Sequence, residues 1–263
     1  MKDFKVAQIV PLAQLEDIRN NHYHMCLAHL VKEDKTGKYA EFYKRMSAEG
    51  KYVLMDNGAA ECSQLDTIDL LRMYEQINPT EIVLPDTLSN SADTIRKTFN
   101  FINELRDLPY KFMAVPQGQT FSEWKACANV MLREKRINSI GVSKFLNITT
   151  GNNRVRLDAC SYVEYMARSL GRRDIEIHLL GCDEGPSIVG CINRLIPNVR
   201  GCDSAFVYIA SKAGIEINEA TQRPSGEIDF LNGEVATGFD ANALLFESIV
   251  GVGSNVESTL WRE

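Results

Sequence analysis

Short apolar runs alternate with amphipathic stretches along most of the chain. The runs are rich in Val, Ile, Leu, Met and Phe, and few of them show the polar alternation of a half-exposed strand. This composition is typical of parallel strands that are covered on both faces. The predicted strands are Lys5–Leu12, Tyr23–Leu30, Tyr52–Asp56, Glu81–Pro85, Lys111–Pro116, Ser139–Ser143, Glu176–Leu180 and Ala205–Ala210.

Helical patterns separate these runs. A capping-box-like Ser63-x-x-Asp66 precedes one of them, and Thr120-x-x-Glu123 opens another. In such a box the two side chains satisfy amide groups that have no partner inside the helix. The apolar stripes expected to face the core consist of Leu65, Ile68, Leu71, Trp124, Val130, Met131, Tyr162, Tyr165, Met166 and Leu170.

Strands that alternate with helices predict an α/β fold, a single (β/α)8 TIM barrel. The 263 residues match the length that such a barrel uses, and no Pro- or Ser-rich linker divides them. We therefore expect one domain over 1–263, with an irregular excursion at 214–240, where Pro224-Ser225-Gly226 and Asn232-Gly233 indicate turns. The alternative is an open doubly wound sheet, but no G-x-G-x-x-G follows the first strand.

The composition limits which binding partners and which cellular compartment we expect for the protein. The chain has 29 Lys and Arg against 35 Asp and Glu, a net charge of −6, which argues against a broad, non-specific nucleic-acid binder but not against a local basic groove. The seven cysteines form no C-x-x-C pair or His–Cys cluster, so we expect no zinc site. The absence of a signal peptide and of a long apolar run favours reduced thiols, a cytoplasmic location and no membrane partner.

Polar residues follow most of the predicted strands. In a β/α barrel the catalytic groups lie where strands end and the following loops begin. The segments concerned are Met55-Asp56-Asn57-Gly58, Leu84-Pro85-Asp86-Thr87, Val115-Pro116-Gln117-Gly118, Gly141-Val142-Ser143-Lys144, Leu180-Gly181-Cys182-Asp183 and Gly201-Cys202-Asp203-Ser204-Ala205.

Several of these residues also have a structural explanation. Asp56-Asn57-Gly58 can form a simple turn, because Asn-Gly favours positive φ. Asp86 can cap the following helix, and Asp203 can be a surface aspartate at the start of the last strand. Gln117, between Pro116 and Gly118, is harder to explain by structure alone.

The four histidines point less clearly to chemistry. His22, His24 and His29 lie around one predicted strand, and strand alternation explains their spacing more simply than a metal site. His178 lies inside another strand, where we expect a core or barrel-interior histidine.

Three aspartates and a glutamine at one rim suit the recognition of a guanine-like base. A carboxylate accepts hydrogen bonds from a ring N–H and an exocyclic amine, while an amide pairs with the base carbonyl. A further carboxylate near an anomeric carbon can act as a nucleophile, as in retaining glycosidases. Spacing alone is equally compatible with an aldolase, an amidohydrolase or a sugar isomerase.

The strand-end segments, taken in order, resemble the tRNA-guanine transglycosylase superfamily over residues 52–210, most of the chain. That family has an Asp-Ser-Gly-Gly-Phe-Gln segment, a later Asp, a Val-Gln-Gly-Gly segment, a Gly-rich strand end, a Met-Gly segment and an Asp nucleophile. The corresponding segments here are Asp56-Asn57-Gly58-Ala59-Ala60-Glu61, Pro85-Asp86-Thr87, Val115-Pro116-Gln117-Gly118, Ile140-Gly141-Val142-Ser143, Leu179-Leu180-Gly181 and Gly201-Cys202-Asp203-Ser204-Ala205.

The resemblance implies a barrel enzyme that exchanges guanine in a polynucleotide for a 7-deazaguanine, without a redox cofactor or ATP. Asp203 would be the nucleophile of a covalent glycosyl intermediate, and Asp56 the general acid and base. The family often reads Gly-x-Asp-x-Phe-Asp with the second Asp reacting, and this chain has only Asp203. In the other alignment register Phe206 takes the reactive place and the chain is inactive.

The resemblance also assigns the residues that bind the base. Asp86 and Gln117 would hold the base edge, and the backbone at Gly141 would contact it. Gly181 falls in the segment that corresponds to Met-Gly and belongs to the same substrate-binding group.

The departures from the family pattern favour a compact member. Ala59, Ala60 and Glu61 replace Gly-Phe-Gln, Lys144 stands where bacterial members often have Glu, and the Cys-x-Cys-x-x-Cys plus His zinc cluster is absent. These features resemble compact, phage-type 7-deazaguanine DNA transglycosylases, which insert bases such as 7-cyano-7-deazaguanine and would place the chain in the host cytoplasm. The alternatives are a small tRNA-guanine transglycosylase and a non-catalytic nucleic-acid-binding paralogue subunit.

Contacts with DNA, or alternatively tRNA, would come from basic residues after strand ends or in the irregular late segment. Charge alone does not distinguish such residues from an ordinary solvated face. Arg172-Arg173 precedes the seventh strand, which places it on the rim opposite the site. The candidates are Lys144, Arg154, Arg156, Arg172, Arg173, Lys212 and Arg223.

Overall fold

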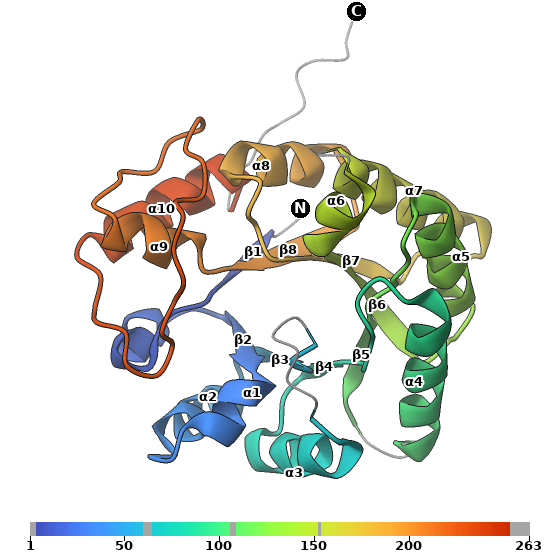
Figure 1. Cartoon of the computed structure of the whole chain (residues 1–263), viewed down its shortest axis with the longest axis horizontal. Coiled ribbons are helices and arrows are strands. Elements are labelled where there is room, and N and C mark those ends of the chain that lie inside the picture. Colours follow the sequence, from blue (N-terminus) through green and yellow to red (C-terminus); the bar gives the residue numbers. More distant parts are fainter. Residues whose placement is uncertain (1–3, 60–64, 106–108, 152–153, 253–263) are drawn as a thin grey trace, which may run out of the picture.

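The computed structural model describes residues 4–59, 65–105, 109–151 and 154–252. Its eight strands are parallel and hydrogen-bonded in the order β1-β8-β7-β6-β5-β4-β3-β2. The two ends of this sheet, β1 and β2, lie next to each other, so the sheet is a nearly closed barrel (Figure 1). The strands are β1 (Lys5–Gln8), β2 (Tyr23–Leu27), β3 (Tyr52–Asp56), β4 (Glu81–Val83), β5 (Lys111–Ala114), β6 (Ile137–Ser143), β7 (Glu176–Leu180) and β8 (Val199–Ser204).

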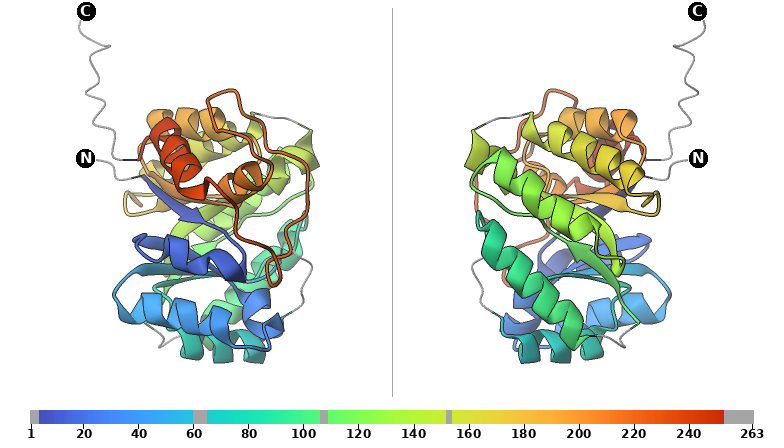
Figure 2. Two further views of the ribbon diagram at one scale, coloured as in Figure 1. Left: turned by 90° about the vertical axis from the view of Figure 1, so that its left-hand side faces the viewer. Right: turned by 90° about the vertical axis from the view of Figure 1, so that its right-hand side faces the viewer.

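Helices surround the strands on the outside, as both side views show (Figure 2). The prediction of a single (β/α)8 barrel is therefore confirmed. Within the described ranges, no helix is long and apolar enough to cross a bilayer. The helices are η1 (Leu12–Ile18), α1 (Ala28–Glu33), α2 (Lys38–Ala48), α3 (Thr67–Ile77), α4 (Ser91–Glu104), α5 (Phe121–Leu132), α6 (Phe145–Thr150), α7 (Val155–Ser169), α8 (Pro186–Leu195), α9 (Phe206–Lys212) and α10 (Phe239–Val250).

The last strand is not where the sequence predicts it. The predicted run Ala205–Ala210 falls on α9, and β8 is the preceding segment, Val199–Ser204. The run is apolar because α9 is buried on nearly all sides, and periodicity does not distinguish a short buried helix from a strand. Asp203 consequently lies near the carboxyl end of its strand and not at the start, which is the end where barrel enzymes build their sites.

Other element boundaries shift for similar reasons. The strand predicted over Tyr23–Leu30 ends at Leu27, so His29 lies in α1. Thr120 caps α5 as predicted, accepting a hydrogen bond from the Glu123 amide. Asp66 caps α3 in the same way, whereas Ser63 lies outside the described residues.

The predicted helix stripes are only partly correct. Ile68, Val130 and Tyr165 are exposed, at 59%, 39% and 67%. The core face of α3 is instead formed by Leu70, Met73, Tyr74 and Ile77. These helices each lie against two neighbours, so the buried arc is set by packing and not by the first apolar residues after the cap.

An extra residue in β8 changes its phase relative to β7. Ile177 pairs with Val199 and His178 pairs with Gly201, so Arg200 is the additional residue. Successive side chains on a strand point to opposite faces, and an inserted residue re-aims those that follow it. Arg200 itself forms ion pairs with Glu81 and Glu176 at the amino-terminal end of the barrel.

The segment between α9 and α10 contains no helix or strand. Its two ends are held by side chains of the barrel: Asn242 accepts from the amide of Ile217, and Gln14 accepts from the amide of Ala236. The amide of Leu12 also donates to the carbonyl of Phe230, at 2.7 Å. The segment between α9 and α10 therefore packs against η1.

Candidate functional site

A cavity of about 460 Å³ opens at the carboxyl ends of the strands. It is where a barrel fold places its reactive groups. Most of the strand ends contribute to its wall, together with the segment between α9 and α10. The polar residues that line it are Asp56, Asn57, Asp86, Gln117, Ser143, Lys144, Asp183, Asp203, Ser204, Arg223 and Glu227.

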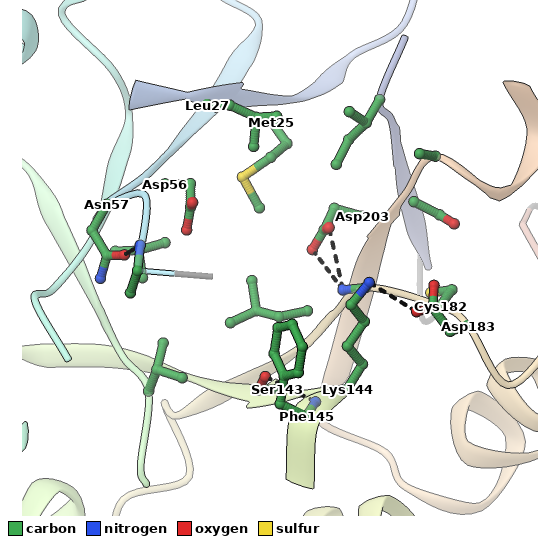
Figure 3. Close-up of a pocket in the computed structure, with 18 of the residues that line it drawn as sticks. Met25, Leu27, Asp56, Asn57, Ser143, Lys144, Phe145, Cys182, Asp183 and Asp203 are labelled. Carbon is green, nitrogen blue, oxygen red and sulfur yellow. Dashed lines mark hydrogen bonds and ion pairs between the residues drawn. The ribbon is translucent and has the colours of Figure 1, made fainter. Parts of the chain in front are cut away.

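Asp203 is buried in the cavity wall, 7% exposed. The amide of Gly181 donates to both carboxylate oxygens, at 3.3 Å to Oδ1 and 3.2 Å to Oδ2 (Figure 3). His178 Nε2 lies 3.0 Å from Oδ1. Both contacts meet carboxylate oxygens, so the Asp203 side chain is fixed in one orientation at the cavity wall.

The alternative register for the nucleophile receives no support. Phe206 lies in α9, 1% exposed, with its ring against Phe246. It does not line the cavity, whereas Asp203 does. Among these two positions, Asp203 is the one that a ligand in the cavity reaches.

Asp86 lies between two amide side chains in a second buried cluster, which we call the Asp86 trio: Asp86, Asn57 and Gln117. Asn57 Nδ2 donates to Oδ1 at 2.8 Å, and Gln117 Nε2 donates to Oδ2 at 2.6 Å. Gln117 is itself oriented by the amide of Ser89, which donates to Oε1. Asp86 does not cap α4, since Asn90 does. The trio presents a carboxylate and an amide to the cavity in fixed orientations.

Burial raises the pKa of the Asp86 carboxyl from 3.8 to about 6, against the opposing hydrogen bonds from Asn57 and Gln117. The native state therefore binds this proton more tightly than the unfolded chain does between about pH 4 and pH 6. Across that window the ionised, buried carboxylate lowers the free energy of unfolding as the pH rises, by about 3 kcal/mol in total.

Replacing Asp86 by Asn should remove this pH dependence. We expect the stability of D86N relative to wild type to increase from pH 4.5 to pH 7, because only the wild type ionises a buried group there. Denaturant unfolding of both proteins across this range measures the difference, and other carboxyls cancel in the comparison. Two parallel stability curves would contradict the assignment.

Asp56 lies across the cavity from Asp203 (Figure 3). Its Oδ2 accepts from the amide of Gly58 at 3.0 Å, and Asn57 Oδ1 accepts from the amide of Ala59 at 2.8 Å. Gly58 has a φ of 76°, so the turn predicted from Asn-Gly is present as well. Asp56 and Asn57 therefore form the predicted turn and also line the cavity. Ala60 and Glu61, which share the motif, lie outside the described residues.

Of the two glycines predicted to bind the base, Gly181 lines the cavity and Gly141 does not. Gly181 lines the cavity, has a φ of +70°, and leaves no room for a Cβ, which would meet Lys144 Cδ at 2.6 Å. Gly141 does not line the cavity: a Cβ there would meet Leu180 Cδ1 at 2.7 Å and Val115 Cγ2 at 3.1 Å. Gly141 thus lies beneath the wall, so the predicted backbone contact with the base is not what the geometry favours.

Two cations share one carboxylate at the cavity rim. Lys144 Nζ lies 2.8 Å from Asp183 Oδ2, and Arg223 Nε lies 3.1 Å from Asp183 Oδ1. The Phe145 ring lies under Lys144 Nζ, 5.5 Å from its centroid. We call Lys144, Asp183 and Arg223 the rim cluster, and it leaves one positive charge unmatched within the cluster.

The other basic candidates are less suited to contact a polynucleotide at this site. Arg156 is a wrong prediction: it is 1% exposed and donates to Glu184 and to carbonyls at the ends of β6 and β7. Arg172 is likewise occupied, bonded to carbonyls between α5 and β6 and to Asp174. The candidates that are exposed but do not line the cavity are Arg154, Arg173 and Lys212.

Within the described ranges, no three His, Cys, Asp or Glu side chains gather as a potential metal site. His24 illustrates the structural histidines: it is buried, its Nε2 meets the carbonyl of Asn21 at 2.9 Å, and burial lowers its pKa from 6.5 to about 4.

Sequence reasoning missed the partner of Asp203. His178 lies in the barrel interior as predicted, but the sequence does not predict its contact with Asp203. The alternation of Glu176, His178 and Leu180 on β7 indicates an inward-facing histidine. The bulge at Arg200, which brings Asp203 to it, has no sequence signal of its own.

Comparisons with known proteins identify the fold and no family. No protein-family model matches the chain, and no curated protein does. The YdjI aldolase from Escherichia coli K12 has a TM-score of 0.58 at 10% identity, over 95% of this chain and 92% of that one. A chain of the tryptophan synthase complex from Pyrococcus furiosus has a TM-score of 0.56 at 9% identity, over 95% and 99%.

Other structural matches are partial. The L-Ala-D/L-Glu epimerase from Bacillus subtilis has a TM-score of 0.51 at 10% identity, over 77% of this chain. The chain spans about half of that protein's length, 54%. At such identities the likeness is one of barrel architecture, a fold that supports many unrelated chemistries.

Proposed function

We propose that the protein is a base-exchange transglycosylase that replaces guanine in DNA by a 7-deazaguanine through a covalent Asp203 intermediate. The observation that carries this proposal is the pairing of two buried carboxylates in one cavity. Asp203 is held in place by contacts with Gly181 and His178, and Asp86 is held between amides that can read a base edge.

The Asp86 trio suits guanine in particular. Guanine presents a ring N–H and an exocyclic amine side by side, and a carboxylate accepts from both. The remaining N–H of the Gln117 amide is available for the base carbonyl. A neutral trio could not offer two acceptors in this arrangement, so the ionised form of Asp86 is the binding form.

The chemistry then follows in two displacements at the anomeric carbon. Asp203 forms a bond to C1′ as the bond from C1′ to guanine N9 breaks, and Asp56 supplies the proton that the leaving base requires. In the second step Asp56 takes the N9 proton of the incoming 7-deazaguanine, whose nitrogen attacks C1′ and releases the Asp203 carboxylate. Two inversions retain the configuration at C1′.

A polynucleotide substrate is supported by the rim cluster. Lys144 and Arg223 come from different segments and are about 30% exposed, at 30% and 28%. A phosphate beside an extruded nucleotide can replace Asp183 as their partner. Extrusion of the target base from a duplex costs a few kcal/mol, so phosphate contacts at the mouth are required to offset it.

The decisive experiment is incubation of the protein with labelled guanine and, separately, double-stranded DNA, single-stranded DNA or unmodified tRNA. We expect label to enter DNA and to be displaced by unlabelled 7-cyano-7-deazaguanine. Incorporation into tRNA alone would identify the small tRNA-guanine transglycosylase instead. Absence of incorporation into either polymer would favour the non-catalytic paralogue.

Lys144 raises a second candidate chemistry, because a lysine at a strand end can form a Schiff base with a carbonyl substrate, as aldolases of one class do. Its nitrogen is engaged in an ion pair with Asp183, which holds it at the rim of the cavity. Borohydride reduction in the presence of a 2-oxo acid tests the alternative. A mass increase at Lys144 would support the aldolase and contradict transglycosylation as the main activity.

Removing the rim cations should weaken polynucleotide binding without affecting the base. We expect K144A and R223A each to lower DNA affinity about three- to tenfold and to reduce the slope of log K against log salt by about one. Guanine affinity should stay within about twofold, since the trio is untouched. Fluorescence anisotropy at several salt concentrations measures the slope.

The matched control is R173A, because Arg173 is an exposed arginine at the opposite end of the barrel. Its salt slope should equal that of the wild type. A larger loss of DNA affinity in R173A than in K144A would place the DNA at the amino-terminal end of the barrel and refute the assignment.

A further inference from the structure

A buried tyrosine and histidine stand in line behind Asp203. His178 is 0% exposed, and its Nε2 lies 3.0 Å from Asp203 Oδ1. On the other side of the ring, Nδ1 lies 2.9 Å from the hydroxyl of Tyr23, itself 3% exposed. The three groups come from β2, β7 and β8, so the line crosses the interior of the barrel.

The protonation states along this line are fixed by chemistry. Burial lowers the pKa of His178, although Asp203 opposes the change, so the ring is neutral at pH 7. Burial keeps the Tyr23 hydroxyl protonated by raising its pKa far above 10. A neutral imidazole has one N–H and one bare nitrogen, and the partner of each nitrogen selects which.

Only one tautomer satisfies both contacts while Asp203 is ionised. A bare Nε2 would direct its lone pair at a carboxylate oxygen, which is repulsive. With the proton on Nε2, the ring donates to Asp203, and Tyr23 donates its O–H to Nδ1. The Tyr23 hydroxyl therefore locks the tautomer that the carboxylate needs.

We propose that Tyr23 and His178 are positioning residues that hold Asp203 Oδ1, and so present Oδ2 as the oxygen that attacks the sugar. The inference rests on the proposed function for its kinetic part, whereas the tautomer follows from the contacts and burial of Tyr23 and His178. His178 touches Asp203 and not the substrate. His178 acts by fixing the rotamer of the Asp203 carboxylate. It also donates a hydrogen bond to this carboxylate when the bond from Asp203 to C1′ breaks in the second displacement.

The tautomer is tested by two-bond ¹H–¹⁵N correlation spectra of the full-length, ¹⁵N-labelled protein at pH 7. We expect His178 to be protonated at Nε2 and bare at Nδ1. Y23F should raise the fraction of the Nδ1–H tautomer above its wild-type level, because the donor to Nδ1 is lost and the contact with Asp203 is left to select the tautomer. The control is Y74F: Tyr74 is also fully buried, but its hydroxyl has no hydrogen-bond partner among the residues that the structure describes.

The positioning role is tested by the kinetics of base exchange. We expect H178L to lower kcat about 10²-fold with KM for the base changed by no more than about twofold, since base binding depends on the trio. H178Q, whose amide can still donate, should recover about tenfold of this loss. H24Q removes another buried histidine that bonds only a backbone carbonyl, and should leave kcat unchanged.

The outcomes separate the two claims. A His178 that is protonated at Nδ1 or is an imidazolium at pH 7 overturns the inference, as does an H178L that keeps kcat within about threefold. If H178L does not fold, Y23F provides both readouts. If wild type exchanges no base yet shows the Nε2–H form, and the fraction of that form falls in Y23F but not in Y74F, the proposed function fails and the tautomer lock stands.

Discussion

The D203N variant should form no covalent adduct with guanine-containing DNA and should lose base exchange by about 10⁴-fold or more. The substitution keeps the shape of the side chain and its place beside Gly181 and His178, so the fold is retained. It removes the negative oxygen that bonds to C1′, and a neutral amide is a poor substitute. Transfer of labelled oligonucleotide to the protein, followed on a denaturing gel, measures the adduct.

The control for D203N is D174N, an exposed aspartate at the amino-terminal end of the barrel whose partner is Arg172. It should react as the wild type does. Guanine affinity of D203N should also stay within a few fold, because the trio lies on other strands. Base exchange that persists in D203N would exclude Asp203 as the nucleophile. The resemblance to the transglycosylases would then lose the residue on which its mechanism depends.

The second large effect is expected at Asp86. D86N should bind guanine about 10²-fold more weakly at pH 7.5, because the amide replaces one of two acceptors by a donor that faces the exocyclic amine. Discrimination against hypoxanthine, which lacks that amine, should largely disappear. Isothermal titration with both bases gives the two affinities, and D174N again serves as the unaffected control.

The pH dependence of base binding identifies the ionised form. Since the pKa of Asp86 is about 6, wild-type affinity for guanine should fall by up to tenfold for each pH unit below about 6. D86N should show no such fall. Affinity that increases as the pH drops would mean that the neutral carboxyl binds the base, and the guanine assignment would then be wrong.

The same residue thus opposes stability and supports binding. Its buried charge lowers the free energy of unfolding above pH 6, and its charge is what a guanine edge requires. A residue kept in this unfavourable state is typical of a functional site. D86N should gain stability relative to wild type at neutral pH and lose affinity for guanine. Measuring both tests this connection without an assay of catalysis.

Much of the fold follows from sequence alone. Strands β3 and β7 have the predicted bounds, and Thr120 begins its helix where expected, since apolar runs and capping residues act locally. The same local rules place Asp56, Asp86 and Gln117 at strand ends. Closing of parallel strands into a barrel then brings strand ends to one rim, so their presence around a single cavity is a consequence of topology.

The rest depends on packing across the barrel. Which arc of α3 is buried, and that Phe206 begins a helix, are set by neighbours distant in sequence. The bulge at Arg200 changes the phase of β8 and brings Asp203 to His178, which no pattern within either strand encodes. Sequence determined the barrel and the set of polar groups at its mouth; tertiary structure decided which of them touch, because register and burial arise only when strands pair.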